Sequence, residues 1–120
     1  MSRVLSHPTR DLIELPMVLD CLSDPTRLAI VYNLAKRADD RELRCGEFYG
    51  LSGKSNLAYH FAKLRESGVL RTRSVGTTRL MSLRRADLEA RFPGLLDAVL
   101  ASASRDAERL ELPDIAFVDA

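Results

Sequence analysis

The chain has 120 residues, 46% of them hydrophobic and 29% charged, and its formal net charge at pH 7 is +1. A chain of this length accommodates one domain with a core of its own. The first residues, MSRVLSHPTRDLIELP, carry four charged side chains and no unbroken apolar run, so we expect neither a signal peptide nor a membrane span, and a cytoplasmic protein. Cys21 and Cys45 lie far apart and outside any CxxC pattern, which argues against a disulfide scaffold or a zinc knuckle.

The positive charge is concentrated in one third of the chain. Residues 53–85 contain eight basic residues and one acidic residue. Residues 1–52 contain seven basic and eight acidic residues, and residues 86–120 contain three and eight. A local net charge of +7 indicates a surface on which a polyanion docks.

The first half of the chain predicts three helices after an extended arm at residues 1–15. PMVLDCLS is typical of a short apolar helix, and SDPTRLAIVYNLAKRA of a longer one with Asp24 as N-cap and Pro25 at the first helical position. A polar turn then leads to a third, short helix from Leu43 to Tyr49, which ends at Gly50.

The second half predicts a helix, a hairpin and two further helices. Residues 53–67 are helical in pattern, and Gly68 stands where a left-handed C-terminal cap is needed. VLRTRSVGTTRLMSL favours a two-stranded hairpin that turns at Gly76. Pro93 separates an early helix from a later one that reaches residue 103, and residues 104–120 are predicted to form a tail. The fold class is mainly α with a small β-hairpin.

The stretch YGLSGKSNLAYHFAKLRESG begins like the end of a phosphate-binding loop. A P-loop requires the pattern GxxxxGK[ST] after a buried strand, because its glycines let backbone N–H groups curl around phosphate oxygens. Gly53, Lys54 and Ser55 supply the end of that pattern, but Phe48 stands where the first glycine belongs. This difference excludes the nucleotide-binding interpretation.

The same stretch fits a DNA-recognition helix with two different faces. Leu57, Phe61 and Leu64 share an apolar face, and the sequence places a polar face opposite it. The candidate groove contacts on that polar face are Ser55, Asn56, Tyr59, His60 and Lys63. The candidate contacts to phosphates are Lys54, Arg73 and Arg79, of which the two hairpin arginines can also reach the adjacent minor groove. Thr77 on the hairpin is a further candidate DNA contact. Together these elements predict a winged helix-turn-helix with about five helices and a two-stranded wing.

LSDPTRLAIVYNLAK, followed by KSNLAYHFAKLRESGVLRTRSVGTTRLMSL, resembles the ArsR family of small bacterial winged-helix transcriptional regulators over residues 16–103. The resemblance implies a homodimeric repressor whose first and last helices form the dimer interface. That interface would use Leu19, Leu22, Leu96, Val99, Leu100 and Ala103. The alternative is that these six residues complete the core of a monomer.

Many members of that family sense metals through cysteines in an ELCVC segment, or through histidine and acidic residues on the last helix. The matching segment here is ELRCG, and the predicted last helix has no histidine, so neither metal site carries over and no cofactor is predicted. An atypical transition-metal site that joins His7 to Cys21, Cys45 or acidic residues across a dimer stays open. A redox pair of the two cysteines also stays open.

These observations lead to a sequence-specific DNA-binding regulator, a homodimeric repressor that binds a double-stranded operator and is released by an unidentified signal. The alternative is a winged-helix interaction module that acts through a partner protein and binds DNA weakly. An enzyme is disfavoured, because two histidines and two cysteines do not supply a nucleophile, a base and an orienting acid together.

Overall fold

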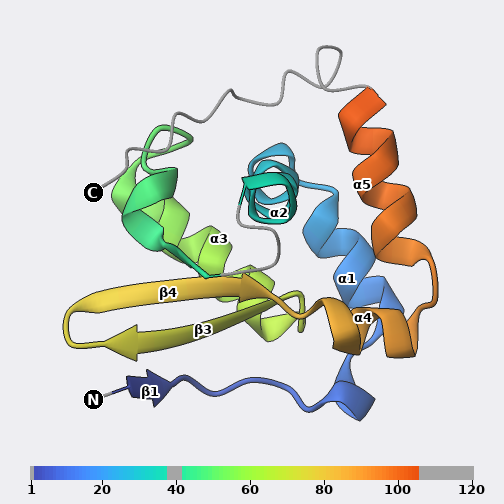
Figure 1. Cartoon of the computed structure of the whole chain (residues 1–120), viewed down its shortest axis with the longest axis horizontal. Coiled ribbons are helices and arrows are strands. Elements are labelled where there is room, and N and C mark those ends of the chain that lie inside the picture. Colours follow the sequence, from blue (N-terminus) through green and yellow to red (C-terminus); the bar gives the residue numbers. More distant parts are fainter. Residues whose placement is uncertain (1, 38–41, 106–120) are drawn as a thin grey trace.

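The computed structural model describes residues 2–37 and 42–105, and the statements below concern these residues. Helices surround one face of a small antiparallel sheet, with α2 lying between α3 on one side and α1 and α5 on the other (Figure 1). In chain order the elements are β1 (Ser2–Val4), the 3-10 helix η1 (Arg10–Leu12), α1 (Leu15–Leu22), α2 (Pro25–Arg37), β2 (Leu43–Arg44), the 3-10 helix η2 (Cys45–Phe48), α3 (Lys54–Glu66), β3 (Leu70–Val75), β4 (Thr78–Leu83), α4 (Arg85–Arg91) and α5 (Leu95–Arg105). The mainly α class, the five α-helices and the hairpin agree with the sequence prediction.

The start of α2 confirms its predicted cap. The Arg27 backbone N–H donates to the Asp24 carboxylate at 3.0 Å, and Pro25 is the first helical residue. A side-chain oxygen at this position satisfies one of the N–H groups that the first helical turn leaves unpaired. Further along the helix, Ile30 and Leu34 are fully buried, so α2 forms the centre of the core.

The predicted third helix is wrong in type. Leu43–Arg44 forms the short strand β2, in which Leu43 pairs with Met81 of β4, and only Cys45–Phe48 turns, as a 3-10 helix. The Arg44 backbone N–H donates to the Glu47 carboxylate at 2.7 Å and fixes this single turn. Glycines at positions 46 and 50 disfavour a longer helix because they lose more backbone freedom than other residues.

The hairpin of β3 and β4 is confirmed, and the sheet has two further strands. The strand order is β1-β3-β4-β2, with every neighbouring pair antiparallel. Val75 pairs with Thr78 next to the turn, where Gly76 has φ of 60°. Two short edge strands, which the sequence did not reveal, therefore widen the predicted two-stranded wing: β1 pairs with β3 next to the turn, and β2 pairs with β4 at Leu80 and Met81.

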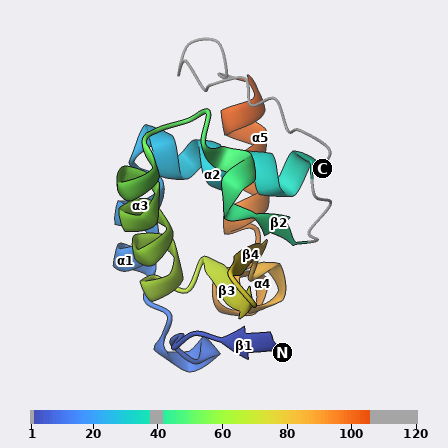
Figure 2. The ribbon, with the colours of Figure 1, turned by 90° about the vertical axis from the view of Figure 1, so that its left-hand side faces the viewer.

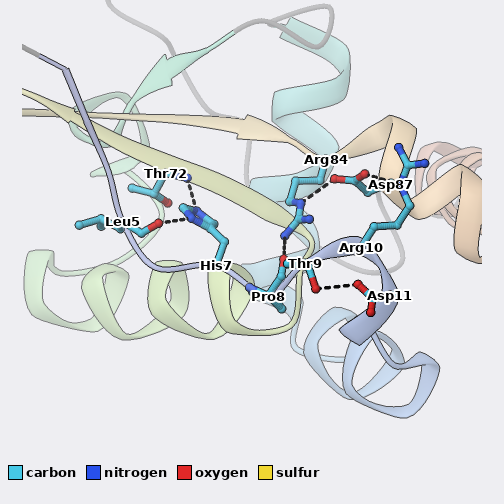
Figure 3. Close-up of polar contacts among 9 residues, drawn as sticks. All are labelled: Leu5, His7, Pro8, Thr9, Arg10, Asp11, Thr72, Arg84 and Asp87. Atoms are coloured by element: carbon cyan, nitrogen blue, oxygen red, sulfur yellow. Dashed lines mark hydrogen bonds and ion pairs between the residues drawn. The ribbon is translucent and has the colours of Figure 1, made fainter.

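The N-terminal arm lies along the free edge of the hairpin (Figure 2). Beyond β1, the Leu5 backbone N–H donates to the Thr72 carbonyl at 3.3 Å. The Thr72 backbone N–H donates to His7 Nε2 at 2.9 Å, and the other ring nitrogen of His7 bonds the Leu5 carbonyl (Figure 3). His7 accepts one hydrogen bond and donates the other, which requires the neutral imidazole.

A cluster of charged residues holds the next part of the arm (Figure 3). Arg84 donates to the Pro8 carbonyl at 2.7 Å and to Asp87 at 2.9 Å, while Arg10 donates to the same carboxylate at 2.7 Å. Burial alone would raise the pKa of Asp87, but the hydrogen bonds from Arg10 and Arg84 outweigh it and lower the pKa. The arm is thus tied to the start of α4 as well as to the wing.

Docking of the arm should weaken in mild acid. Burial is the main cause that lowers the pKa of His7, with Arg84, Arg71 and Arg65 adding to it against the opposing hydrogen bond to Leu5. Because the pKa of His7 is lower in the folded protein, neutral His7 stabilises the docked arm fully above its unfolded pKa of about 6.5. This stabilisation is lost as the pH falls through the lower pKa of the folded state. Amide exchange at Thr72 should therefore accelerate relative to other strand amides between about pH 7.5 and pH 5.

The His7→Gln variant is the matched control for that measurement. A glutamine amide has a donor and an acceptor but does not titrate in this range. Exchange at Thr72 in the variant should lose the additional acceleration in acid. An equal acceleration in both proteins would show that His7 is not the group that responds.

The C-terminal helices follow the predicted division. Helix α4 ends at Arg91, and α5 begins after Pro93 and Gly94 and continues to Arg105, two residues beyond the predicted end. Of the predicted tail, residues 106–120 lie outside the described residues. None of the helices in the described ranges combines the length and apolar character of a membrane span.

Candidate nucleic-acid interface

Helix α3 is anchored by a buried apolar stripe. Leu57 and Leu64 are fully buried and Phe61 is nearly so, which confirms the predicted inner face. The Phe61 ring meets Phe48 of η2 edge to face, with centroids 5.6 Å apart. This packing fixes which side chains α3 presents to the outside.

The outer face of α3 carries four of the five predicted groove residues. Ser55, Asn56, Tyr59 and Lys63 are exposed. The Lys63 ammonium lies 5.6 Å from the centre of the Tyr59 ring, so these two side chains form one cation–π pair. The Asn56 side-chain N–H donates to the Ser52 hydroxyl at 2.6 Å, which holds the amide at the start of the helix.

His60 is not on the outer face, and this corrects the sequence interpretation. Its ring is 7% exposed and lies against the start of α2. Arg27 Nη1 donates to His60 Nδ1 at 3.2 Å, and an Asp24 carboxylate oxygen is 3.8 Å from the same nitrogen. His60 follows Leu57 by three positions and precedes Leu64 by four, so the helical period itself places it on the inner side.

The hairpin places two of its three predicted residues in the open. Arg79 on β4 and Thr77 in the turn are exposed, and the hairpin extends past the body of the protein beneath α3 (Figure 1). Arg71 on β3 is also exposed, a residue that the sequence interpretation did not select. The signal that would have found it is its position two residues before Arg73 on the same strand, which places both arginines on one face of the hairpin.

Arg73 is engaged with a carboxylate instead of facing solvent freely. Its guanidinium donates to both oxygens of Glu42, at 2.6 and 2.7 Å. These hydrogen bonds lower the pKa of Glu42, so the carboxylate stays ionised at neutral pH. A phosphate would have to compete with Glu42 for Arg73.

The predicted dimer residues divide into two groups. Leu22, Leu96 and Ala103 are buried within the protomer, as the alternative interpretation expected for them. Val99 and Leu100 are partly buried, and Leu19 is 46% exposed. Three further apolar side chains close to Leu19 in the sequence are also exposed: Leu12, Leu15 and Met17.

The thiols and His7 lie in separate surroundings. His7 is bonded to the arm and to β3, Cys21 is buried, and the Cys45 sulfur lies 4.0 Å from the Tyr49 hydroxyl. Burial is the main cause that raises the pKa of Cys21, which keeps that thiol protonated and unreactive. Within residues 2–37 and 42–105, no three potential metal ligands of the His, Cys, Asp or Glu type converge.

Comparisons with known proteins show what the chain resembles in sequence and in fold. No protein-family model matches the chain. It is 36% identical over 84 residues to the uncharacterized HTH-type transcriptional regulator YceK of Bacillus subtilis (strain 168), an alignment that covers 68% of this chain and 82% of YceK. Its fold matches the crystal structure of an ArsR family transcriptional regulator with a TM-score of 0.55 and 20% identity, covering 91% of this chain and all of the other.

The likeness to YceK shows the family, and the crystal structure shows the fold, so the resemblance drawn from the sequence is confirmed. The chain belongs to the HTH-type transcriptional regulators, which bind DNA, and it has the winged-helix fold of an ArsR family regulator.

Proposed function

We propose that the protein is a homodimeric repressor that occupies a pseudo-palindromic operator and leaves it in response to a signal. The observation that carries this proposal is the continuous outer surface of α3 and the hairpin, which is basic and carries polar side chains. The only acidic residue between positions 53 and 85 is Glu66, at the last position of α3.

In this proposal, α3 enters the major groove with its first turns toward the bases. Asn56 is suited to adenine, because its amide offers a donor and an acceptor side by side, and Lys63 is suited to guanine or phosphate. Lys54, beside the start of the helix, and Arg79, on the hairpin, contact phosphates. Arg71 adds a further phosphate contact that lies on the same hairpin.

The dimer would form through the apolar surface around α1. Leu15 and Leu19 are four residues apart on one face of that helix, and Leu12 lies just before it. Exposed apolar side chains that adjoin one another are typical of protein interfaces. Two-fold symmetry would then present two copies of α3 to half-sites about one helical turn of DNA apart.

Two variants separate the proposed roles on DNA. Arg79→Ala should weaken binding to every duplex similarly and reduce the slope of log affinity against log salt by about one unit. Asn56→Ala should reduce affinity for the operator but not for random duplexes, relaxing discrimination by about 1–3 kcal/mol. Fluorescence anisotropy with the DNA upstream of the gene and a shuffled duplex, across salt concentrations, measures both effects.

Arg105→Ala is the matched control, because Arg105 is an exposed arginine and the last residue of α5. That end of α5 lies on the other side of the molecule from the hairpin (Figure 1). The variant should leave the salt slope unchanged. Equal losses on both duplexes for Asn56→Ala would overturn the role of Asn56. Binding that requires a second protein would favour the alternative of a winged-helix interaction module.

A further inference from the structure

We propose that the groove between α3 and the hairpin binds a small organic anion with an apolar body, and that this ligand competes with DNA. The competition rests on the proposed function, whereas the binding itself does not. The groove has a volume of about 460 Å³. Small-molecule sites typically have about 300–1,000 Å³, apolar walls and a few convergent polar groups.

The walls of the groove come from elements that the fold holds rigidly. Ala58, Phe61 and Ala62 line it from α3, and Met81 lines it from β4. Phe61 and Met81 belong to the buried core, so their positions are determined by packing rather than by a ligand. These side chains offer an apolar surface to the body of a ligand.

Among the described residues, the charges that line the groove are all of one sign. Lys54, Arg65 and Arg79 line it, and no carboxylate of residues 2–37 or 42–105 does. Elsewhere in the described chain, Arg73 and Arg84 have carboxylate partners, at 2.6 and 2.9 Å. Three cations around one hollow, without an acidic partner in the described part of the chain, favour an anion, to which each can donate a charge-assisted hydrogen bond.

Thr72 supplies a second, independent observation. It lines the groove and is 2% exposed, and its hydroxyl has no hydrogen-bond partner among the described residues. Its backbone, in contrast, is fully bonded to Leu5 and His7 of the arm. Buried hydroxyls without a partner are uncommon because they are destabilising, and a ligand oxygen in the groove would satisfy this one.

The position of the groove gives such a ligand a regulatory effect. Lys54 and Arg79 are also the residues that we propose for DNA phosphates. An anion held between them neutralises the charge on which the phosphate contacts depend, so DNA affinity falls. A DNA phosphate is the rival occupant, and it differs from the proposed ligand in having no apolar body.

The test uses the whole chain and four probes: 2-naphthoate, octanoate, the neutral 2-naphthamide and inorganic phosphate. Titrations followed by two-dimensional NMR should show saturable shifts at Phe61, Thr72 and Met81 with the two carboxylates. Binding should be at least about tenfold weaker for 2-naphthamide, which lacks the charge, and for phosphate, which lacks the apolar body. The carboxylates should also release a labelled duplex at the concentrations that saturate the shifts.

Two variants test the assigned residues. Arg65→Gln should weaken 2-naphthoate binding by about tenfold and change DNA affinity by less than about twofold, since Arg65 is not among the residues that we propose to contact bases or phosphates. Thr72→Val should raise the urea midpoint of unfolding and yet weaken 2-naphthoate binding several-fold, a combination that a purely structural role of the hydroxyl does not produce.

The proposal is overturned if neither carboxylate saturates by about 10 mM, beyond the range of a weak but real site. Equal affinity for phosphate would show that the groove only seats a DNA phosphate, and equal affinity for 2-naphthamide would show that its charges are not used. If the carboxylates bind but no duplex does, the ligand site stands and the proposed function fails. If duplexes bind and the carboxylates do not, the proposed function stands and the ligand site fails.

Discussion

Replacing Gly68 with alanine should lower the free energy of unfolding by about 2–4 kcal/mol. Gly68 follows α3 and has φ of +86°, a conformation that is unfavourable for residues with a Cβ atom. A Cβ at this position would lie 2.5 Å from Cγ1 and 2.8 Å from Cδ1 of Ile13. Ile13 is 1% exposed and belongs to the core, so it has no open space into which to move. Urea unfolding of the variant and of the parent measures the loss.

Gly94→Ala is the matched control for the clash. Gly94 has φ of +82°, nearly the same as Gly68, but a Cβ there would have no neighbour within 4 Å. This variant should lose only the backbone contribution, about 1–2 kcal/mol. Equal losses for the two variants would show that the contact with Ile13 adds nothing.

A double variant identifies the partner in the clash. Ile13→Ala alone should be destabilising, because it leaves a cavity in the core. Combined with Gly68→Ala, its loss should be less than additive, since each change relieves part of the other. Additive losses would place the strain elsewhere. Ile13 of the arm thus lies against Gly68, directly after the end of α3.

Features with local signals were predictable from the sequence. Asp24 and Pro25 mark the start of α2 because a cap acts on the next few residues, and Gly76 marks the hairpin turn because only its own φ is involved. The sequence predicted a helix from Leu43 to Tyr49, where the structure has a short strand followed by a 3-10 helix. The segment has few apolar residues and two glycines, so its pattern is compatible with either structure.

Features that depend on distant contacts were not predictable. Part of the contact between the arm and the sheet is the hydrogen bond from the Thr72 backbone N–H to His7, two residues that are 65 positions apart, and nothing near His7 in the sequence indicates a strand partner. Arg73 likewise meets Glu42 from 31 positions away. The concentration of charge in residues 53–85 was visible, but which cations are paired and which are not depends on the folded chain.

The position of His60 points to a network that holds the recognition helix. Arg27 donates from Nε to the Cys21 carbonyl at 2.7 Å and from Nη1 to His60 Nδ1 at 3.2 Å. One side chain thereby connects the end of α1, the start of α2 and the inner face of α3. If α1 forms the dimer interface as we propose, this network also links the interface to the helix that enters DNA.

Arg27→Ala should lower the free energy of unfolding by about 2–4 kcal/mol, because it leaves the Cys21 carbonyl and the His60 ring nitrogen without their donor. His60→Ala, alone and combined with Arg27→Ala, completes a double-mutant cycle whose coupling energy should be about 1 kcal/mol. Arg27→Lys is the matched control: it keeps the charge but lacks the fork of donors, so it should restore only part of the loss.

The same variants should separate positioning from simple stability. Below the unfolding temperature, Arg27→Ala and His60→Ala should reduce discrimination between operator and random duplex while leaving the salt slope unchanged, because neither side chain reaches a phosphate. A destabilising variant remote from α3, such as Gly94→Ala, should leave discrimination intact. If Gly94→Ala also loses discrimination between operator and random duplex, Arg27 and His60 act only through global stability. If Gly94→Ala retains it, Arg27 and His60 orient α3.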